Sequence, residues 1–176
     1  TNNHVVEGQS TVKVTTSDKQ QYDATVVGTD DKTDIAVLKI DASGLTPAVI
    51  GDSDGLVVGE TAVAVGNPLG TLGGTGTDGI ISALDREVTV NNQTMTLLQM
   101  SAAVSPGNSG GGLFNERGDL VGIVNAKSGG SDVEGIGFAV PINTAMEVAE
   151  QLIANGYVSG RPAMGIQVVA ITDLQT

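Results

Sequence analysis

The chain has 176 residues, of which 40% are apolar and 16% are charged. This length and this apolar share are enough to bury the core of one medium-sized domain. Twenty acidic residues against eight basic ones give a net charge of −12, which repels phosphate backbones, so we expect no nucleic acid partner. The absence of cysteine excludes disulfides, thiolate metal sites and a cysteine nucleophile. The sequence contains no run of eighteen apolar residues, which is the pattern that would indicate a membrane-spanning helix.

Short runs rich in Val, Ile and Thr, separated by turn residues, dominate the chain up to residue 140. They predict strands at 11–15, 24–27, 35–40, 61–65, 80–84, 88–90, 97–99, 120–124 and 137–140. Many short strands without intervening helices favour an all-β fold, because closed barrels leave no exposed sheet edges. Two packed barrels fit this pattern best.

A helix and a domain division complete the predicted organisation. From Ile142 to Ile153 apolar residues recur at helical spacing, with Asn143 as the expected N-cap and Gly156 as the expected stop. We expect this C-terminal helix to pack on the second barrel and to have no catalytic role. Gly, Pro, Ser and Asp cluster at 44–58, and a Gly/Pro linker follows the helix, so the chain divides into three parts. These are the remainder of an N-terminal barrel (1–58), a C-terminal barrel with the helix (59–157), and a linker with a new strand (158–176).

Two further motifs are interpreted as turns rather than as sites. Asp52-Ser53-Asp54-Gly55 lacks the length and the final Glu of a calcium loop, so we expect a solvated turn. The run from Gly74 to Gly79 fits G-x-G-x-x-G, but neither a βαβ pattern nor a downstream acid accompanies it. We expect a flexible loop there.

The chemistry of the chain is concentrated in Pro106-Gly107-Asn108-Ser109-Gly110-Gly111-Gly112, where four glycines surround one serine. Glycine allows a tight turn that exposes the hydroxyl and the neighbouring N–H groups, as an acyl-transfer site requires. His4, the only histidine, lies far upstream, and Asp34 directly precedes an apolar strand-like run. The order His, Asp, Ser favours a chymotrypsin-type site over an α/β-hydrolase elbow, whose histidine follows the serine.

Each of these residues has a predicted role. A serine hydroxyl needs a base to take its proton as it attacks a carbonyl, and His4 is that base. Asp34 is expected to hold the imidazole Nδ1–H and to stabilise the imidazolium. The loop of Gly107, Asn108 and Ser109 is the predicted oxyanion hole, with the N–H groups of Gly107 and Ser109 as donors. This chemistry requires no metal and no cofactor.

Taken singly, the same residues have ordinary structural interpretations. A lone histidine is more often a packed or surface residue, and a Gly-rich serine turn is more often a hairpin. Asp34 alone is most simply a turn residue that caps a strand. Only the constellation of the three residues indicates catalysis.

Several segments together resemble the bacterial HtrA (Deg) serine proteases. They are Thr1 to Val6, Thr33 to Leu38, Gly66-Asn67-Pro68-Leu69-Gly70, Ser105 to Gly111, and Gly135 to Pro141. The resemblance implies a chymotrypsin-like fold of two six-stranded antiparallel barrels, the first incomplete in this chain. It places the start of a PDZ domain at 158–176.

The resemblance also implies a biological setting. Proteases of this family act on unfolded or misfolded proteins in quality control and the stress response. The full-length protein would be a homotrimer, activated by peptides through PDZ domains. It would be extracytoplasmic, in the periplasm or at the cell surface, and anchored to the membrane.

In a chymotrypsin-like fold the residues before the nucleophile line the primary side-chain pocket, which predicts roles for Ala103, Val104 and Ser105. Ile136 and Gly137 would form a wall of the pocket, and the segment from Gly135 would be an edge strand for an extended peptide. Since this set contains no acid, we expect small or medium apolar side chains at P1, the residue before the cut bond.

A second function class stays open at this point. A protease-like module could hold unfolded peptides without cutting them, because too few strands are predicted before residue 58 to close a first barrel. The missing strands are expected to come from another chain or from upstream residues.

Overall fold

The computed structural model describes residues 1–90, 93–126 and 135–161. Its helices are α1 (Asn3–Val6), the 3₁₀ turn η1 (Pro68–Gly70) and α2 (Ile142–Asn155). Its strands are β1 (Val12–Thr15), β2 (Gln21–Asp30), β3 (Ile35–Ile40), β4 (Thr61–Gly66), β5 (Thr75–Val90), β6 (Gln93–Met100), β7 (Gly112–Phe114), β8 (Leu120–Val124) and β9 (Gly137–Pro141).

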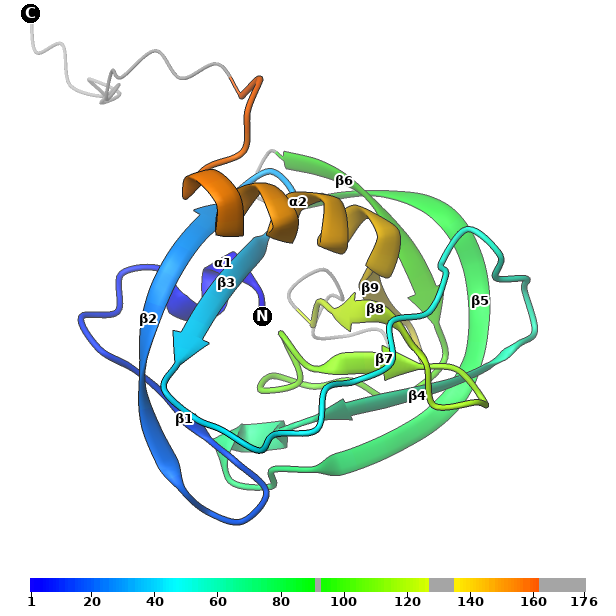
Figure 1. Cartoon of the computed structure of the whole chain (residues 1–176). Coiled ribbons are helices and arrows are strands. Elements are labelled where there is room, and N and C mark those ends of the chain that lie inside the picture. Colours follow the sequence, from blue (N-terminus) through cyan, green and yellow to red (C-terminus); the bar gives the residue numbers. More distant parts are fainter. Residues whose placement is uncertain (91–92, 127–134, 162–176) are drawn as a thin grey trace, which may run out of the picture.

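The strands form one open sheet and one closed barrel. β1, β2 and β3 pair in that order as an antiparallel sheet, and β4-β5-β6-β9-β8-β7 close into a six-stranded antiparallel barrel. Figure 1 shows the open sheet beside the barrel, with α2 lying across both. The predicted all-β architecture, with an incomplete first barrel, a six-stranded second barrel and a C-terminal helix, is confirmed.

Individual strands differ from the sequence prediction in three ways. The predicted strands at 80–84 and 88–90 belong to one continuous strand, β5, whose register with β6 shifts between Ile81 and Arg86. The expected loop at 74–79 is wrong, because residues 75–79 begin β5 and pair with β4. Strand β7 was not predicted, since it has only three residues, begins within the glycine run and carries no alternation of polarity.

The first residues of the chain extend the open sheet. Asn2 forms an antiparallel bridge with Ile35 of β3, and Thr1 and Ala36 exchange backbone hydrogen bonds of 2.9 and 3.2 Å. Burial lowers the pKa of the Thr1 α-amino group, and the Asp34 charge partly opposes this effect. This pairing places the short helix α1, which follows directly, at one end of β3.

Two apolar clusters hold the molecule together. The first fills the barrel and consists of Leu56, Ala62, Ala64, Ile81, Leu98, Met100, Ala102, Leu113, Val121, Val124 and Ala139. The second joins the barrel to α2 and the open sheet, and consists of Ile35, Leu97, Phe138, Val140, Ile142, Ala145, Val148, Leu152 and Val158. We call the second set the shared core. It fixes the open sheet against the barrel.

The N-cap of helix α2 lies two residues earlier than the sequence indicated. Its N-cap is Pro141, and the expectation of Asn143 as the cap is wrong, because Asn143 lies inside the first turn. The Asn143 N–H instead donates to Ser53 Oγ at 3.2 Å, so a residue 90 positions away caps the helix. The stop at Gly156 is confirmed: it has a left-handed φ of 80° and donates its N–H to Leu152.

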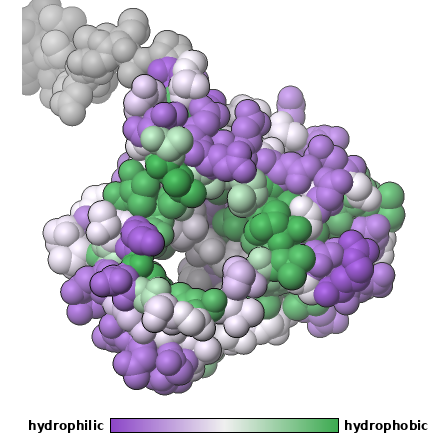
Figure 2. Space-filling view, viewed as in Figure 1, coloured by the Kyte–Doolittle hydropathy of each residue, from purple (hydrophilic) through white to green (hydrophobic). Residues whose placement is uncertain are grey.

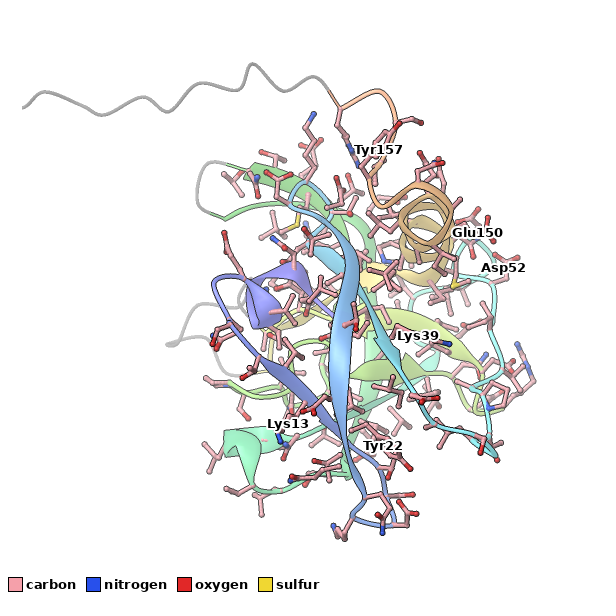
Figure 3. All side chains as sticks on the ribbon, turned by 60° about the vertical axis from the view of Figure 1, so that its left-hand side comes forward. Lys13, Tyr22, Lys39, Asp52, Glu150 and Tyr157 are labelled. Carbon is pink, nitrogen blue, oxygen red and sulfur yellow. The ribbon has the colours of Figure 1, made fainter. Side chains whose placement is uncertain are left out.

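The helix packs on more than the barrel. It contacts β2 and β3 of the open sheet as well as β8 and β9. Figure 3, turned to bring the sheet forward, shows α2 nearly end-on above β2 and β3, with Glu150 on its outer side. The expected lid on the second barrel is therefore also the connection between the two sheets.

A hollow remains beneath α2, between the open sheet and the barrel (Figure 2). The cavity there measures about 310 Å³ and has apolar residues on most sides, among them Val37, Leu38, Ile123, Met146 and Ala149. Among the described residues no helix combines the length and the apolar character that crossing a membrane requires.

The new strand expected within 158–176 falls mostly on residues 162–176, outside the described residues.

Candidate active site

His4 lies on α1, and its side chain is 18% exposed. Two hydrogen bonds join it to Asp34: the His4 backbone N–H donates to Oδ1 at 2.9 Å, and Nδ1 lies 2.6 Å from Oδ2. With the Nδ1 proton directed at the carboxylate, Nε2 is the ring nitrogen that is free to take a proton. The structure thus brings together two residues 30 positions apart.

Asp34 is buried at the start of β3, in a turn that imposes a left-handed φ of 56°. A residue other than glycine adopts this conformation at a cost, and Asp is one of the residues that tolerate it best. The Asp34 carbonyl accepts hydrogen bonds from the Asn3 N–H and from Asn2 Nδ2, both at 3.0 Å. The turn therefore holds the carboxylate toward His4.

The sequence analysis missed two residues that hold Asp34. Asn125 donates its Nδ2–H to Asp34 Oδ2 at 3.0 Å and is 1% exposed, and Asn2 is fully buried. Asn125 follows the predicted strand at 120–124 directly, which is the only sequence signal for it. An asparagine after a strand is normally a turn residue, so pattern reasoning does not single it out.

Ser109 lies in the loop before β7 and is partly buried. Its Oγ accepts a hydrogen bond from the Ala126 N–H at 3.2 Å, and the described residues form no hydrogen bond between Ser109 Oγ and His4 Nε2. Both side chains nevertheless line one cavity of about 410 Å³, together with Val5, Pro106, Gly107 and Ala126. Its volume lies in the range of ligand sites in proteins.

The serine loop packs against the segment that carries His4. A Cβ on Gly110 would collide with the Thr1 side chain, so glycine permits the two segments to approach this closely. His4 comes from α1 and Asp34 from the turn between β2 and β3, both next to the open sheet, and Ser109 comes from the loop between β6 and β7 of the barrel. The site is therefore assembled from both sheets.

The predicted oxyanion loop is held by hydrogen bonds to the 67–69 turn, which fix the direction of the Gly107 N–H. The Pro106 carbonyl accepts from the Leu69 N–H at 3.1 Å, and the Gly107 carbonyl accepts from the Asn67 N–H at 3.3 Å. In a trans peptide the N–H points opposite to the C=O, so the Gly107 N–H points away from the 67–69 turn. Gly107 has a φ of 100°, and a Cβ there would collide with the Asn67 carbonyl oxygen.

The three N–H groups of this loop are not equivalent. The Asn108 N–H donates to the Ser105 carbonyl at 3.0 Å, so it already has a partner within the loop. For the N–H groups of Gly107 and Ser109 no acceptor is found among the described residues. These two are the groups able to bind a developing oxyanion.

The predicted pocket residues are partly clustered. Gly137 lies against Val104, because a Cβ on Gly137 would be 2.9 Å from Val104 Cγ2. Ala103 is exposed, Ser105 is half-buried, and Ile136 is 36% exposed. Residues 135 and 136 lie before β9, and Gly137 pairs with Met100 of β6 but has no partner in β8, so the expected edge strand for a peptide at 135–137 stays a prediction. Among the described residues, no group of three His, Cys, Asp or Glu could hold a metal ion.

Comparisons with known proteins agree with this geometry. Residues 1–123 match the family model described as a trypsin-like peptidase domain, which defines the class of the protein. A closed barrel beside a second sheet, with a His–Asp pair facing a serine loop, is the architecture of that class. Within it, the chain belongs to the HtrA family of Do-like serine proteases.

Three relatives illustrate the similarity. The "Serine protease Do-like HtrA" of Lactococcus lactis subsp. cremoris is 44% identical over 188 residues, covering all of this chain and 46% of the relative. A Pseudomonas savastanoi protein named "Probable periplasmic serine endoprotease DegP-like" is 45% identical, with 90% of this chain and 33% of the relative covered. The solved "HtrA-type protease AlgW with decapeptide" matches with a TM-score of 0.81 and 45% identity, covering 89% of this chain and 48% of that one. The chain thus spans less than half the length of these relatives.

Proposed function

We propose that this chain is the catalytic part of a serine endopeptidase that uses Ser109 as nucleophile, His4 as base and Asp34 as the residue orienting His4. The observation that carries the proposal is the 2.6 Å contact between His4 Nδ1 and Asp34 Oδ2, on the wall of a cavity shared with Ser109. A buried carboxylate that also binds the His4 backbone fixes the ring in one orientation.

The proposed reaction has two halves. In the first, His4 Nε2 takes the Ser109 Oγ proton as Oγ bonds to the substrate carbonyl carbon, and the proton then passes to the leaving amine as the C–N bond breaks. In the second, His4 takes a proton from water, the hydroxide attacks the acyl-enzyme ester, and Ser109 recovers its proton. The N–H groups of Gly107 and Ser109 stabilise the oxyanion in both halves, each contributing about 3 to 4 kcal/mol.

The assignment of the nucleophile is tested by labelling. A serine-directed phosphonate should attach to Ser109 alone, as mass spectrometry of the digested chain would show. We expect Ser109→Ala or His4→Ala to lower kcat by about 10⁶-fold, because each removes part of one catalytic unit. Ser17→Ala serves as the control, because Ser17 is an exposed serine far from Ser109 in the sequence. An adduct on any other residue would refute the assignment.

We further propose that the substrates are unfolded or misfolded proteins, cut after small or medium apolar residues. Val104 and Gly137 lie together, and Ala103, Ser105 and Ile136 complete a set of uncharged residues near the loop. Sequencing the products of casein digestion should show cleavage after Val, Ala or Ile. Predominant cleavage after Lys or Arg would contradict this pocket, because it would require an acid within reach.

The biological setting that we propose follows the family. A Pseudomonas savastanoi relative is named as periplasmic, which supports an extracytoplasmic site of action in protein quality control. AlgW has been solved with a decapeptide, which supports peptide binding by the longer protein. A membrane anchor, a homotrimer and activation through PDZ domains are part of the same proposal. So are the chain divisions at 58 and 157.

One observation favours the second candidate function, a module that holds peptides without cutting them. Ser109 Oγ accepts from the Ala126 N–H, and no hydrogen bond to His4 Nε2 is present among the described residues. In unliganded serine enzymes this bond often tightens only when substrate binds, which favours the protease. Active-site titration decides: about one label per chain supports the protease, whereas casein binding without labelling or cleavage supports the module.

A further inference from the structure

We propose that Arg161 is a positioning residue for the catalytic carboxylate, acting through Asp30 and the turn that ends at Asp34. This inference rests on the proposed function and extends it to the segment after α2. Arg161 follows Asp30 by 131 positions and lies six residues beyond the end of α2 at Asn155. It therefore connects the C-terminal segment to the turn that carries Asp34.

The contact is an ion pair between a buried carboxylate and a partly exposed guanidinium, with additional hydrogen bonds. Asp30 is the last residue of β2 and is 5% exposed. Its Oδ2 accepts from Arg161 Nη2 at 2.9 Å, from the Thr33 N–H at 3.1 Å and from the Thr33 hydroxyl at 2.6 Å. Arg161 is the only cation paired with Asp30 among the described residues. When a buried carboxylate loses its one counter-charge, the folded state is strongly destabilised.

The turn from Asp30 to Asp34 depends on that carboxylate. Asp30 accepts hydrogen bonds from both donors of Thr33, its N–H and its hydroxyl, and Thr33 is the residue directly before Asp34. Asp34 itself holds a left-handed φ of 56°, and such a conformation persists only where the surroundings fix it. A turn that relaxes would rotate the Asp34 carboxylate relative to His4. Arg161 thus acts on the catalytic pair without touching it.

A cavity on the same side of the molecule shows that the ion pair is accessible. It measures about 450 Å³ and is lined by Lys32, Thr33 and Arg161 together with residues of β6. The Arg161 side chain is 34% exposed, whereas the Asp30 side chain is 4% exposed. A displacement of the C-terminal segment would therefore withdraw Arg161 and leave Asp30 buried. Through the Arg161–Asp30 ion pair, the position of this segment affects how the Asp34 carboxylate is oriented toward His4.

The experiment compares Arg161→Ala and Arg161→Lys with Arg117→Ala. Arg117 also pairs with an aspartate, Asp119, but at the exposed surface. With a peptide cleaved after valine, we expect Arg161→Ala to lower kcat about 10-fold with KM changed less than two-fold, because geometry and not binding is affected. Arg161→Lys should restore part of kcat, and Arg117→Ala should leave it unchanged. Equal kcat in Arg161→Ala and Arg117→Ala would overturn the proposal.

A second readout is independent of turnover. His4 is the only histidine, so ¹³C-labelled histidine gives a single set of imidazole signals. These signals should shift in Arg161→Ala and in Asp30→Asn, and the double variant should shift no further than either one. If Ser109 cannot be labelled in the parent chain but these shifts occur, the proposed function fails and the positioning role stands. If the signals match those of the parent chain, the positioning role fails.

Discussion

At the residue scale, the Asp34 carboxylate is the most heavily restrained group of the site. Three donors converge on it: the His4 N–H, His4 Nδ1 and Asn125 Nδ2. Hydrogen bonds to the charged form of a carboxylate stabilise that form and fix its orientation. Asn125 supplies the one donor of the three that does not come from His4, and it reaches Asp34 from the barrel.

Asn125→Ala should therefore affect catalysis beyond its effect on folding. The substitution removes a buried donor to Asp34 Oδ2, and we expect kcat to fall about 10-fold per folded molecule. The loss of a buried hydrogen bond should also lower the free energy of unfolding by about 1 to 3 kcal/mol. Steady-state kinetics and urea denaturation measure the two effects separately.

Asn115→Ala is the matched control, because Asn115 is also buried and hydrogen-bonded but binds Asp119 and Arg117. It should reduce stability and leave kcat per folded molecule unchanged. Equal kcat in the two variants would show that Asn125 only supports the fold.

At the element scale, the start of α2 depends on a segment distant in sequence. The loop at 52–53 binds Asn143 through the Ser53 hydroxyl, the Ser53 N–H and the Asp52 carboxylate, the last at 2.8 Å. The Asn143 hydrogen bond is the main cause that lowers the pKa of Asp52, followed by the bond from the Asp54 N–H. A carboxylate beside a helix N-terminus is favourable in the ionised form.

Asn143→Ala should reduce stability in a pH-dependent way. The folded-state pKa of Asp52 lies below the unfolded value of 3.8, so its contribution is fully present above that value and is lost as pH falls through the folded-state pKa. The urea midpoint of the variant should therefore lie below that of the parent chain at pH 7, and the gap should narrow near pH 3.

Thr144→Ala, at the exposed neighbouring position, controls for the change in helix propensity. A gap of constant size from pH 7 to pH 3 would show that Asp52 takes no part and that the Ser53 contacts account for the whole loss. Asp52→Ala should reproduce the pH-dependent part alone.

At the scale of the whole molecule, the sequence predicted the features that depend on local patterns. It did not predict those that depend on contacts between residues distant in the chain. Alternating polarity located most strands, and the chain order of His4, Asp34 and Ser109 predicted a site that the structure gathers around one cavity. Asn125 was missed because its importance depends on a contact across 91 positions. The Asn143 cap was misplaced for the same reason, since Ser53 provides the hydroxyl. Residues 75–79 were taken as a loop because their glycines hide pairing with β4.

The shared core has a consequence for how the molecule unfolds. It takes Ile35 from β3, Leu97 from β6, Phe138 from β9 and Leu152 from α2. The two sheets therefore bury these side chains in one common cluster rather than in separate cores. Elements that share one buried cluster lose it together, which favours all-or-none melting over stepwise loss. In rising urea, circular dichroism and peptidase activity should therefore decline along one superimposable curve. A loss of activity well before the loss of ellipticity would contradict this expectation. It would mean that His4 and Asp34 separate from Ser109 while the barrel is still folded.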